Sequence, residues 1–350
     1  MKLSYVTPLT FPSRFVNRLQ VMKMSAAFAK QADFRLYIAK SRMSHAELFQ
    51  TYNIHDSFRV EEVGNTILPP RRIWQARKFL PTVKNASPDV VWYIRDILLA
   101  DWLLFLSSRF ASRYFFELHT LSRFSEQRYC RVLSRARGII TTNDEKKKDI
   151  MERFGMPADR ILVAPNAVDV DEFLALRGQK EEYKKKLGFA GSAPLVVYTG
   201  TDKEEYGTGV LRQAARLLGD AATVQIISGR PRREALEYMA AADVLVAPYL
   251  PANEHFRNYM SPMKIREYMA MERPIVVSDL PSIHAYLPED AVYYVPPGDA
   301  AKLADAIRMV CGNNAQEALQ RTQCAFAHIE KSSWGARAKC IIDFMEKLSA

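Results

Sequence analysis

The sequence of 350 residues lacks the patterns on which several classes of protein depend. Its longest apolar run, residues 97–106, contains Asp101 and falls far short of the roughly 20 residues that a membrane-spanning helix needs. The four cysteines form no CxxC pair and no HExxH pattern occurs, so neither a zinc site nor a disulfide framework is indicated. The N-terminus has one lysine and a short apolar segment followed by prolines, which is not a secretory signal pattern. We therefore expect a cytoplasmic protein with reduced thiols and no bound metal.

The charge is distributed unevenly along the chain. Residues 1–170 contain 27 lysines and arginines against 16 aspartates and glutamates, whereas the remainder contains 22 against 23. The net charge of +10 therefore comes from the first half. A basic half attracts an anionic partner, which could be an acidic membrane surface, a lipid-linked pyrophosphate or nucleic acid. A solvated basic face without a partner is the alternative.

Short apolar runs alternate with helical patterns along almost the whole chain, as in parallel α/β proteins. The expected strands are residues 3–7, 34–39, 90–95, 114–118, 138–141 and 161–164, and then residues 195–199, 223–227, 244–247, 275–278 and 292–295. The length and the restart of this alternation predict two tandem Rossmann-like, doubly wound domains with a ligand cleft between them. The first domain is expected to span residues 1–165 and the second residues 166–333, with a final helix at 334–350 that packs back on the first.

The segment that begins at Ser261, SPMKIREYMA, has the pattern of a helix start. Ser261 can cap the helix and Pro262 fits its first position, so the first-turn amides, including that of Met263, stay free to bind an anion. Lys264 adds a positive charge, and Glu267 follows on the same face with a carboxylate for hydroxyl groups. A diphosphate joined to a ribose would satisfy both features. A plain helix cap with a surface lysine is the alternative.

The longer segment SPMKIREYMAMERPIVVSD closely resembles the donor-binding helix of family 4 glycosyltransferases, which are retaining enzymes of the GT-B fold. The resemblance implies that Glu267 binds the ribose of a nucleotide-sugar and that Lys264, with the amides of residues 261–264, stabilises the leaving diphosphate. The family often has another glutamate eight positions before Glu267, which contacts the transferred sugar. This sequence has Tyr259 there, so the resemblance leaves the donor sugar and the effect on activity open.

Two segments of the first half resemble the same family. RILVAPNAVD, followed by Phe173, is similar to its interdomain strand and linker, with Ala167 in place of a glycine. The string from Asp169 to Asp171 also matches a metal-binding DxD motif, but its place on a linker favours the structural interpretation. His119 follows a predicted strand where the family has a histidine that binds the donor sugar, although a lone histidine there can be structural.

Arg95 closes another predicted strand of this half. It can point toward the cleft or form a salt bridge with Glu117 or Asp96, and the sequence does not decide between these positions.

The second half contains YTGTDK, with Gly200 and Lys203, followed by Tyr206 and Gly207. This stretch resembles the family's "G…KG" loop, which supplies a basic residue to the donor phosphates. Tyr206 stands where lysine is usual, so we expect Lys203 or Arg230 to take that role.

The first strand-to-helix loop, residues 7–17, has no glycine, although the family often has a glycine-rich loop there. Arg14, Asn17 and Arg18 are expected to bind anionic groups on the acceptor side through their side chains. Solvated arginines on a helix that merely packs are the alternative.

These features predict a glycosyltransferase that moves a sugar from a UDP- or GDP-sugar to a saccharide or lipid-linked saccharide, with retention and without a metal or other cofactor. The expected context is glycan or polysaccharide biosynthesis, with peripheral contact at the anionic inner face of a membrane and none with nucleic acid. A non-catalytic GT-B-like binding protein and a nucleotide-sugar epimerase are the alternatives. The sequence does not specify the base, the sugar, the acceptor or the oligomeric state.

Overall fold

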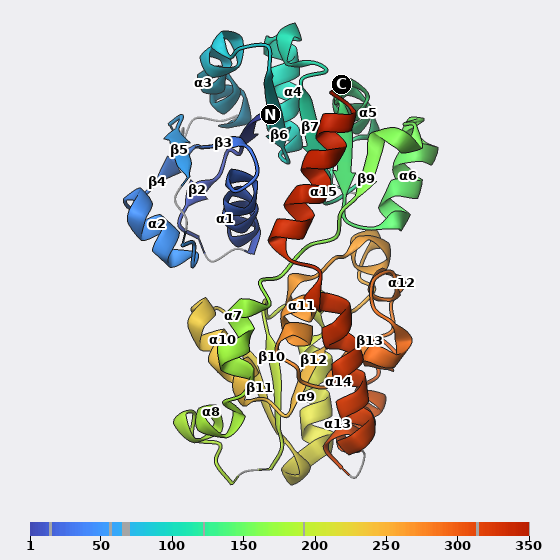
Figure 1. Ribbon diagram of the computed structural model, residues 1–350. Coiled ribbons are helices and arrows are strands. Elements are labelled where there is room, and N and C mark those ends of the chain that lie inside the picture. Colours follow the sequence, from blue (N-terminus) through green and yellow to red (C-terminus); the bar gives the residue numbers. More distant parts are fainter. Residues whose placement is uncertain are drawn as a thin grey trace. The chain divides into compact units, whose positions relative to one another are not determined.

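The computed structural model describes residues 1–13, 16–55, 58–64, 71–121, 123–191, 193–312 and 315–349. The chain divides into two compact units (Figure 1). Met1–Pro165 together with Trp334–Ala350 form unit 1, and Asn166–Ser333 form unit 2. Each unit is built on a parallel sheet flanked by helices, which confirms the predicted α/β class.

In the described part of unit 1, seven strands form one parallel sheet in the order β5-β3-β1-β6-β7-β8-β9. Their bounds are β1 Lys2–Val6, β3 Asp33–Ile38, β5 Arg59–Glu62, β6 Val90–Ile94, β7 Tyr114–Glu117, β8 Gly138–Thr141 and β9 Ile161–Val163. A two-stranded sheet pairs β2, Thr10–Phe11, with β4, Lys40–Ser41. The chain adds β3 and β5 on one side of β1 and then adds β6 to β9 on the other side. The carboxyl ends of β1 and β6 therefore form a topological switch point, where sheets of this kind bind ligands.

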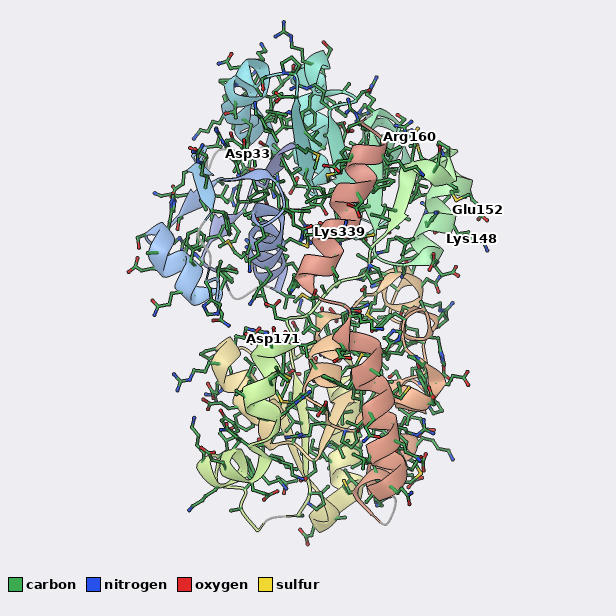
Figure 2. All side chains as sticks on the ribbon, viewed as in Figure 1. Asp33, Lys148, Glu152, Arg160, Asp171 and Lys339 are labelled. Atoms are coloured by element: carbon green, nitrogen blue, oxygen red, sulfur yellow. The ribbon has the colours of Figure 1, made fainter. Side chains whose placement is uncertain are left out.

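The helices of unit 1 include one from the C-terminal end of the chain. Their bounds are α1 Val16–Ala29, α2 His45–Thr51, α3 Arg71–Asn85, α4 Ile97–Leu106, η1 Ser108–Phe110, α5 Glu126–Arg135, α6 Asp144–Phe154, η2 Ala158–Arg160 and α15 Trp334–Lys347. Helix α15 lies beside α1 (Figure 1), and its Phe344 meets Phe115 of β7 edge to face with ring centroids 5.9 Å apart. Helix α6 exposes Lys148 and Glu152 on its outer side (Figure 2). None of the helices traced here is long and apolar enough to cross a membrane.

The sheet of unit 2 is also parallel, in the order β11-β10-β12-β13-β14. Its strands are β10 Leu195–Thr199, β11 Thr223–Ile227, β12 Val244–Ala247, β13 Ile275–Ser278 and β14 Tyr293–Val295. The helices are α7 Asp171–Arg177, α8 Lys180–Lys186, η3 Glu204–Tyr206, α9 Thr208–Leu218, η4 Gly219–Ala221, α10 Arg232–Ala241, the π-helix η5 His255–Tyr259, α11 Met263–Ala270, α12 Pro281–His284, η6 Glu289–Ala291, α13 Ala300–Cys311 and α14 Ala315–Glu330. The chain places β11 on one side of β10 and β12 to β14 on the other, so the switch point of this sheet lies between β10 and β12.

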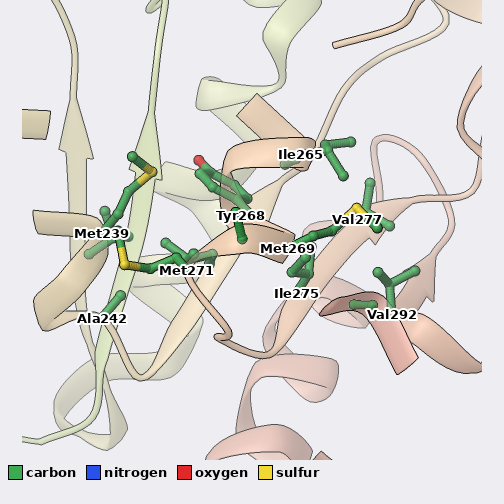
Figure 3. Packing of buried hydrophobic residues seen from close by; sticks show 14 of the residues in the cluster. Met239, Ala242, Ile265, Tyr268, Met269, Met271, Ile275, Val277 and Val292 are labelled. Atoms are coloured by element: carbon green, nitrogen blue, oxygen red, sulfur yellow. The ribbon is translucent and has the colours of Figure 1, made fainter. Parts of the chain in front are cut away.

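Alternate residues of β10 belong to two different hydrophobic cores, one on each face of the sheet. Leu195 and Val197 pack in the core that α10, α11 and α14 cover, whereas Val196 and Tyr198 pack in the core that α9 and α13 cover. Figure 3 shows the first core, where Tyr268 and Met269 of α11 are buried. The strands read as continuous apolar runs because both of their faces are covered.

Candidate functional site

The candidate donor site lies at the carboxyl ends of β10 and β12, at the switch point of the unit 2 sheet. Helix α11 begins near these strand ends and is fixed there by Tyr268. The hydroxyl of Tyr268 accepts a hydrogen bond from Thr199 N at 2.9 Å and lies 3.2 Å from Thr199 Oγ1. This contact ties the second turn of α11 to the last residue of β10.

The first turn of α11 differs from the expected one. Pro262 is the N-cap residue, with φ −73° and ψ 125°, and the helix begins at Met263 without a side-chain cap. Ser261 lies outside the helix, where Asn166 Nδ2 donates to Ser261 O at 2.6 Å and Asn166 N donates to Ser261 Oγ at 3.4 Å. The prediction that Ser261 caps α11 is therefore wrong, because Asn166 binds Ser261 instead. The first-turn amides still lack a capping side chain.

Lys264 directs its ammonium to the switch point. The residue as a whole is half-buried, but Nζ is shielded from solvent and meets no hydrogen-bond acceptor among the described residues. Gly200 adopts φ 133°, a conformation that other residues rarely adopt, and a Cβ there would lie 2.8 Å from Nζ. Burial holds the pKa of Lys264 well below its usual value, and Glu267 opposes this shift. Gly200 and Lys264, two of the residues that the sequence singled out, thus meet in space.

Glu267 is buried and bound to an arginine that sequence reasoning missed. Arg232 Nη1 donates to Glu267 Oε1 at 2.5 Å, and Arg232 Nη2 lies 3.2 Å from Glu172 Oε2. Burial would lower the pKa of Arg232, but Glu267 and Glu172 outweigh it and raise that pKa above its usual value. The only sequence signal was that Arg232 opens a helix directly after β11, at the same edge of the sheet.

Lys203 and Arg230 lie on the loops that follow β10 and β11, and both are exposed. Arg230 pairs with Glu234 at 3.3 Å across one helical turn. Both residues are at the predicted edge of the sheet, although neither is buried as Lys264 Nζ is.

In the loop after β10, the residue that follows Tyr206 must be a glycine. Gly207 adopts φ 72°, and a Cβ there would lie 1.6 Å from Pro248 O, so no other residue fits without moving the backbone. This close approach fixes η3, and the ring of Tyr206 comes within 5.4 Å of Lys264 Nζ.

His119 of unit 1 belongs to a buried charge network after β7. Its Nε2 lies 3.3 Å from Glu117 Oε1, and that oxygen accepts a hydrogen bond from Arg337 Nη2 of α15 at 2.6 Å. Burial, and next the positive charge of Arg95, lower the pKa of His119 to about 4, so the imidazole is neutral at neutral pH. Nothing in the sequence marked Arg337, since 220 positions separate it from Glu117.

Arg95, at the end of β6, is not a partner of Asp96. Asp96 pairs with Arg72 at 3.0 Å, whereas Arg95 Nη2 donates to Gln20 Oε1 at 3.2 Å. Burial would lower the pKa of Arg95, but Tyr5 and then Glu117 outweigh it and raise that pKa, although Arg337 holds the Glu117 carboxylate directly.

Lys146 of α6 completes the network, and sequence reasoning missed it as well. Its Nζ donates to Thr142 Oγ1 at 2.5 Å and to His119 O at 3.4 Å. Burial lowers the pKa of Lys146 to about 7, and Glu117 opposes this shift. The lysine thereby supports the backbone that carries His119.

Of the predicted acceptor-side residues, Arg14 lies outside the described residues. Asn17 and Arg18 are half-buried in the first turn of α1, where Arg18 Nη1 donates to Asn17 Oδ1 at 2.9 Å. The aspartate string leads into α7, and its Asp171 is an exposed first residue of that helix (Figure 2).

Comparison with known proteins bears on the family and the fold. Two family models match, one described as Glycosyltransferase Family 4 over residues 20–172 and one described as Glycosyl transferases group 1 over residues 181–313. TuaC of Bacillus subtilis, described as a teichuronic acid biosynthesis glycosyltransferase, is 24% identical over 162 residues. That match spans 41% of this chain and 40% of TuaC.

Solved structures of GT-B enzymes share the fold over the whole chain. HepE of Anabaena in complex with UDP and glucose has a TM-score of 0.75 at 14% identity, and each chain is covered completely. Sucrose-phosphate synthase of Thermosynechococcus elongatus has a TM-score of 0.72 at 15% identity, with 99% of each chain covered. The two matched families together with this fold lead to one assignment. The chain belongs to the family 4 glycosyltransferases and has the GT-B fold.

Proposed function

We propose that this protein transfers a sugar from a UDP- or GDP-sugar to a saccharide or lipid-linked saccharide, with retention of anomeric configuration. The observation that carries the proposal is the ammonium of Lys264, which is buried at the switch point of the unit 2 sheet without an acceptor among the described residues. A diphosphate supplies the acceptors that this ammonium lacks. The HepE structures with UDP and with UDP-glucose support a nucleotide-sugar as the donor.

In the proposed reaction, Lys264 and the first-turn amides of α11 stabilise the negative charge that develops on the leaving diphosphate. Met263 and Lys264 provide these amides, whereas Ser261 precedes the helix and Pro262 has no N–H to donate. Loss of one preorganised donor of this kind costs about 3 kcal/mol of transition-state stabilisation. Lys203 and Arg230 are exposed and can turn toward the phosphates.

Glu267 is the proposed ligand of the ribose. Arg232 bonds Oε1 of Glu267, which leaves Oε2 to accept from a ribose hydroxyl. Arg232 fixes the direction of the carboxylate, so the acceptor atom is in place before the donor binds.

In unit 1, we assign His119 as a hydrogen-bond partner of the donor sugar. Its imidazole is neutral at neutral pH and can donate to or accept from a sugar hydroxyl. The acceptor hydroxyl transfers its proton to a phosphate oxygen of the donor, so the proposal needs neither a protein base nor a metal ion.

Asn17 and Arg18 are proposed to bind the acceptor, which we expect to be lipid-linked because unit 1 also carries an apolar and basic surface. A cavity of about 650 Å³ between α4 and α5 is lined by Trp102, Phe105 and Arg135, and Phe105 is 77% exposed. Aromatic and arginine side chains together favour the headgroup region of an anionic bilayer. Equal co-sedimentation with neutral and acidic liposomes at low salt would argue against this acceptor class.

A thermal-shift and product assay tests the proposal. UDP or GDP at about 100 times its dissociation constant should stabilise the protein by about 2.7 kcal/mol, and Lys264→Ala should abolish the shift. The matching sugar nucleotide, incubated with a saccharide acceptor, should yield a glycoside whose anomeric configuration equals that of the donor, as NMR coupling constants report. An inverted product would refute retention, and no shift with any nucleoside diphosphate would refute the donor class.

A further inference from the structure

Three tyrosine rings enclose the ammonium of Lys264. Nζ lies 3.7 Å from the ring centroid of Tyr198, 5.1 Å from that of Tyr249 and 5.4 Å from that of Tyr206. Each distance is within the roughly 6 Å over which a cation is attracted to the face of an aromatic ring. The rings come from β10, from the segment after β12 and from η3, three separate elements that converge at the switch point. We call these three residues the tyrosine cage.

The tyrosine cage replaces water around the ammonium. Nζ is buried without a hydrogen-bond acceptor in the described part of the chain, and a buried charge needs some compensation. Besides the three rings, the charged group that acts on Lys264 is Glu267, which is itself bound to Arg232. The negative electrostatic potential at the faces of the three rings therefore compensates the positive charge of the ammonium at close range.

The cage is built from fixed parts. Tyr206 meets the ring of Phe256 edge to face with centroids 5.3 Å apart and lies 5.8 Å from the ring of Tyr249. Gly207 locks η3 against Pro248, as described above, and the hydroxyl of Tyr198 donates to Thr201 O at 2.7 Å. Gly200 leaves the space that the ammonium occupies. The position of Nζ is thus determined by packing that does not require a ligand.

We propose that Tyr198, Tyr206 and Tyr249 are positioning residues that hold the Lys264 ammonium dry at the strand ends where the donor diphosphate binds. The inference rests on the proposed function, in which Lys264 meets that diphosphate. An ammonium that has already lost its water and its side-chain freedom loses little more when the anion arrives. The exposed Lys203 and Arg230 must instead be ordered and desolvated at that moment. Tyr206, which the resemblance to the "G…KG" loop places where lysine is usual, acts here by holding another lysine in place.

The contact itself is tested without any nucleotide, by a double-mutant cycle on melting temperature. Tyr206→Leu removes the ring, and Lys264→Met removes the charge with little change in length. We expect Tyr206→Leu to lower the melting temperature by about 2–4 °C more in the natural background than in the Lys264→Met background. Equal losses in both backgrounds would mean that ring and ammonium are not coupled, and would overturn the cage.

The positioning role is tested by calorimetric titration with UDP. Tyr206→Leu should weaken UDP binding about tenfold, and Tyr206→Phe, which keeps the ring, should restore it to within about twofold. Tyr183→Leu is the matched control, because Tyr183 also lies near a lysine, Lys186 at 5.6 Å, but on α8. In the Lys264→Met background, Tyr206→Leu should change UDP binding less than twofold.

The outcomes separate the two claims. A loss of affinity of the same size in the Lys264→Met background would show that Tyr206 acts through packing alone and would overturn the positioning role. A natural protein that binds neither UDP nor GDP would overturn the proposed function and the positioning role together, whereas the stability cycle would still decide whether the rings hold the ammonium.

Discussion

Removal of Arg337 should strongly destabilise unit 1, because its guanidinium is buried against a carboxylate. Arg337 Nη2 bonds Glu117 Oε1 at 2.6 Å, and the two side chains are 4% and 3% exposed. The same guanidinium donates to Pro165 O at 2.9 Å and to Ala164 O at 3.2 Å. Arg337→Met leaves a buried carboxylate and two carbonyls without their donor. Breaking a buried pair in this way costs about 3–5 kcal/mol.

The assay is urea unfolding followed by tryptophan fluorescence. All four tryptophans, Trp74, Trp92, Trp102 and Trp334, belong to unit 1, so their emission reports the unfolding of that unit. Lys339→Met is the matched control on the same helix (Figure 2), because Lys339 and Asp343 form a pair that is 68% and 57% exposed. An exposed pair contributes little, so the control should change the free energy of unfolding by less than about 0.5 kcal/mol.

The loss should also depend on pH. Burial raises the pKa of Glu117, but Arg337 and then His119 outweigh it and hold that pKa well below its usual value. A carboxyl whose pKa is lowered on folding stabilises the protein above its unfolded pKa of about 4.3. The difference between the natural protein and Arg337→Met should therefore be largest near neutral pH and shrink as the pH falls below about 4. A loss under about 1 kcal/mol at pH 7 would refute the assignment of a buried pair, given its expected cost.

Two further predictions concern single positions. Gly207→Ala should lower the free energy of unfolding by at least about 2 kcal/mol, because its Cβ would lie 1.6 Å from Pro248 O at φ 72°. Gly209→Ala is the control: its Cβ meets nothing within 4 Å, and it should raise the free energy of unfolding by about 0.5–1 kcal/mol. Equal effects of the two substitutions in chemical denaturation would contradict this account of the loop. His119, with a pKa lowered to about 4, should stay neutral in an NMR titration well below the ordinary histidine pKa of about 6.5. Its neutral form stabilises the folded protein above about pH 6.5, and that stabilisation should be lost as the pH falls toward 4; a titration midpoint near 6.5 would show that the imidazole is not buried as described.

The fold could be predicted from the sequence because strands covered on both faces appear as continuous apolar runs. Residues 195–199 and 244–247, expected as strands, are β10 and β12. The family could be predicted as well, since the segment from Ser261 onward is contiguous and carries its chemistry on one helix. Local patterns of this kind need no knowledge of distant contacts.

The arrangement of the site could not be predicted to the same extent, because its contacts join distant parts of the chain. Arg232 and Glu267 are 35 positions apart, and Asn166 and Ser261 are 95 apart. The capping role predicted for Ser261 was wrong for this reason, since a serine before a proline is a reasonable cap until a distant asparagine binds it. The tyrosine cage has no sequence pattern either, because its rings come from three separate elements.

Calorimetric titration of the natural protein and of Lys264→Met with UDP and GDP tests the central claim most directly. The account predicts that at least one nucleoside diphosphate binds the natural protein, and that loss of the ammonium weakens this binding at least about a hundredfold, as expected for a preorganised charged donor. Equal affinity of the two proteins would contradict it.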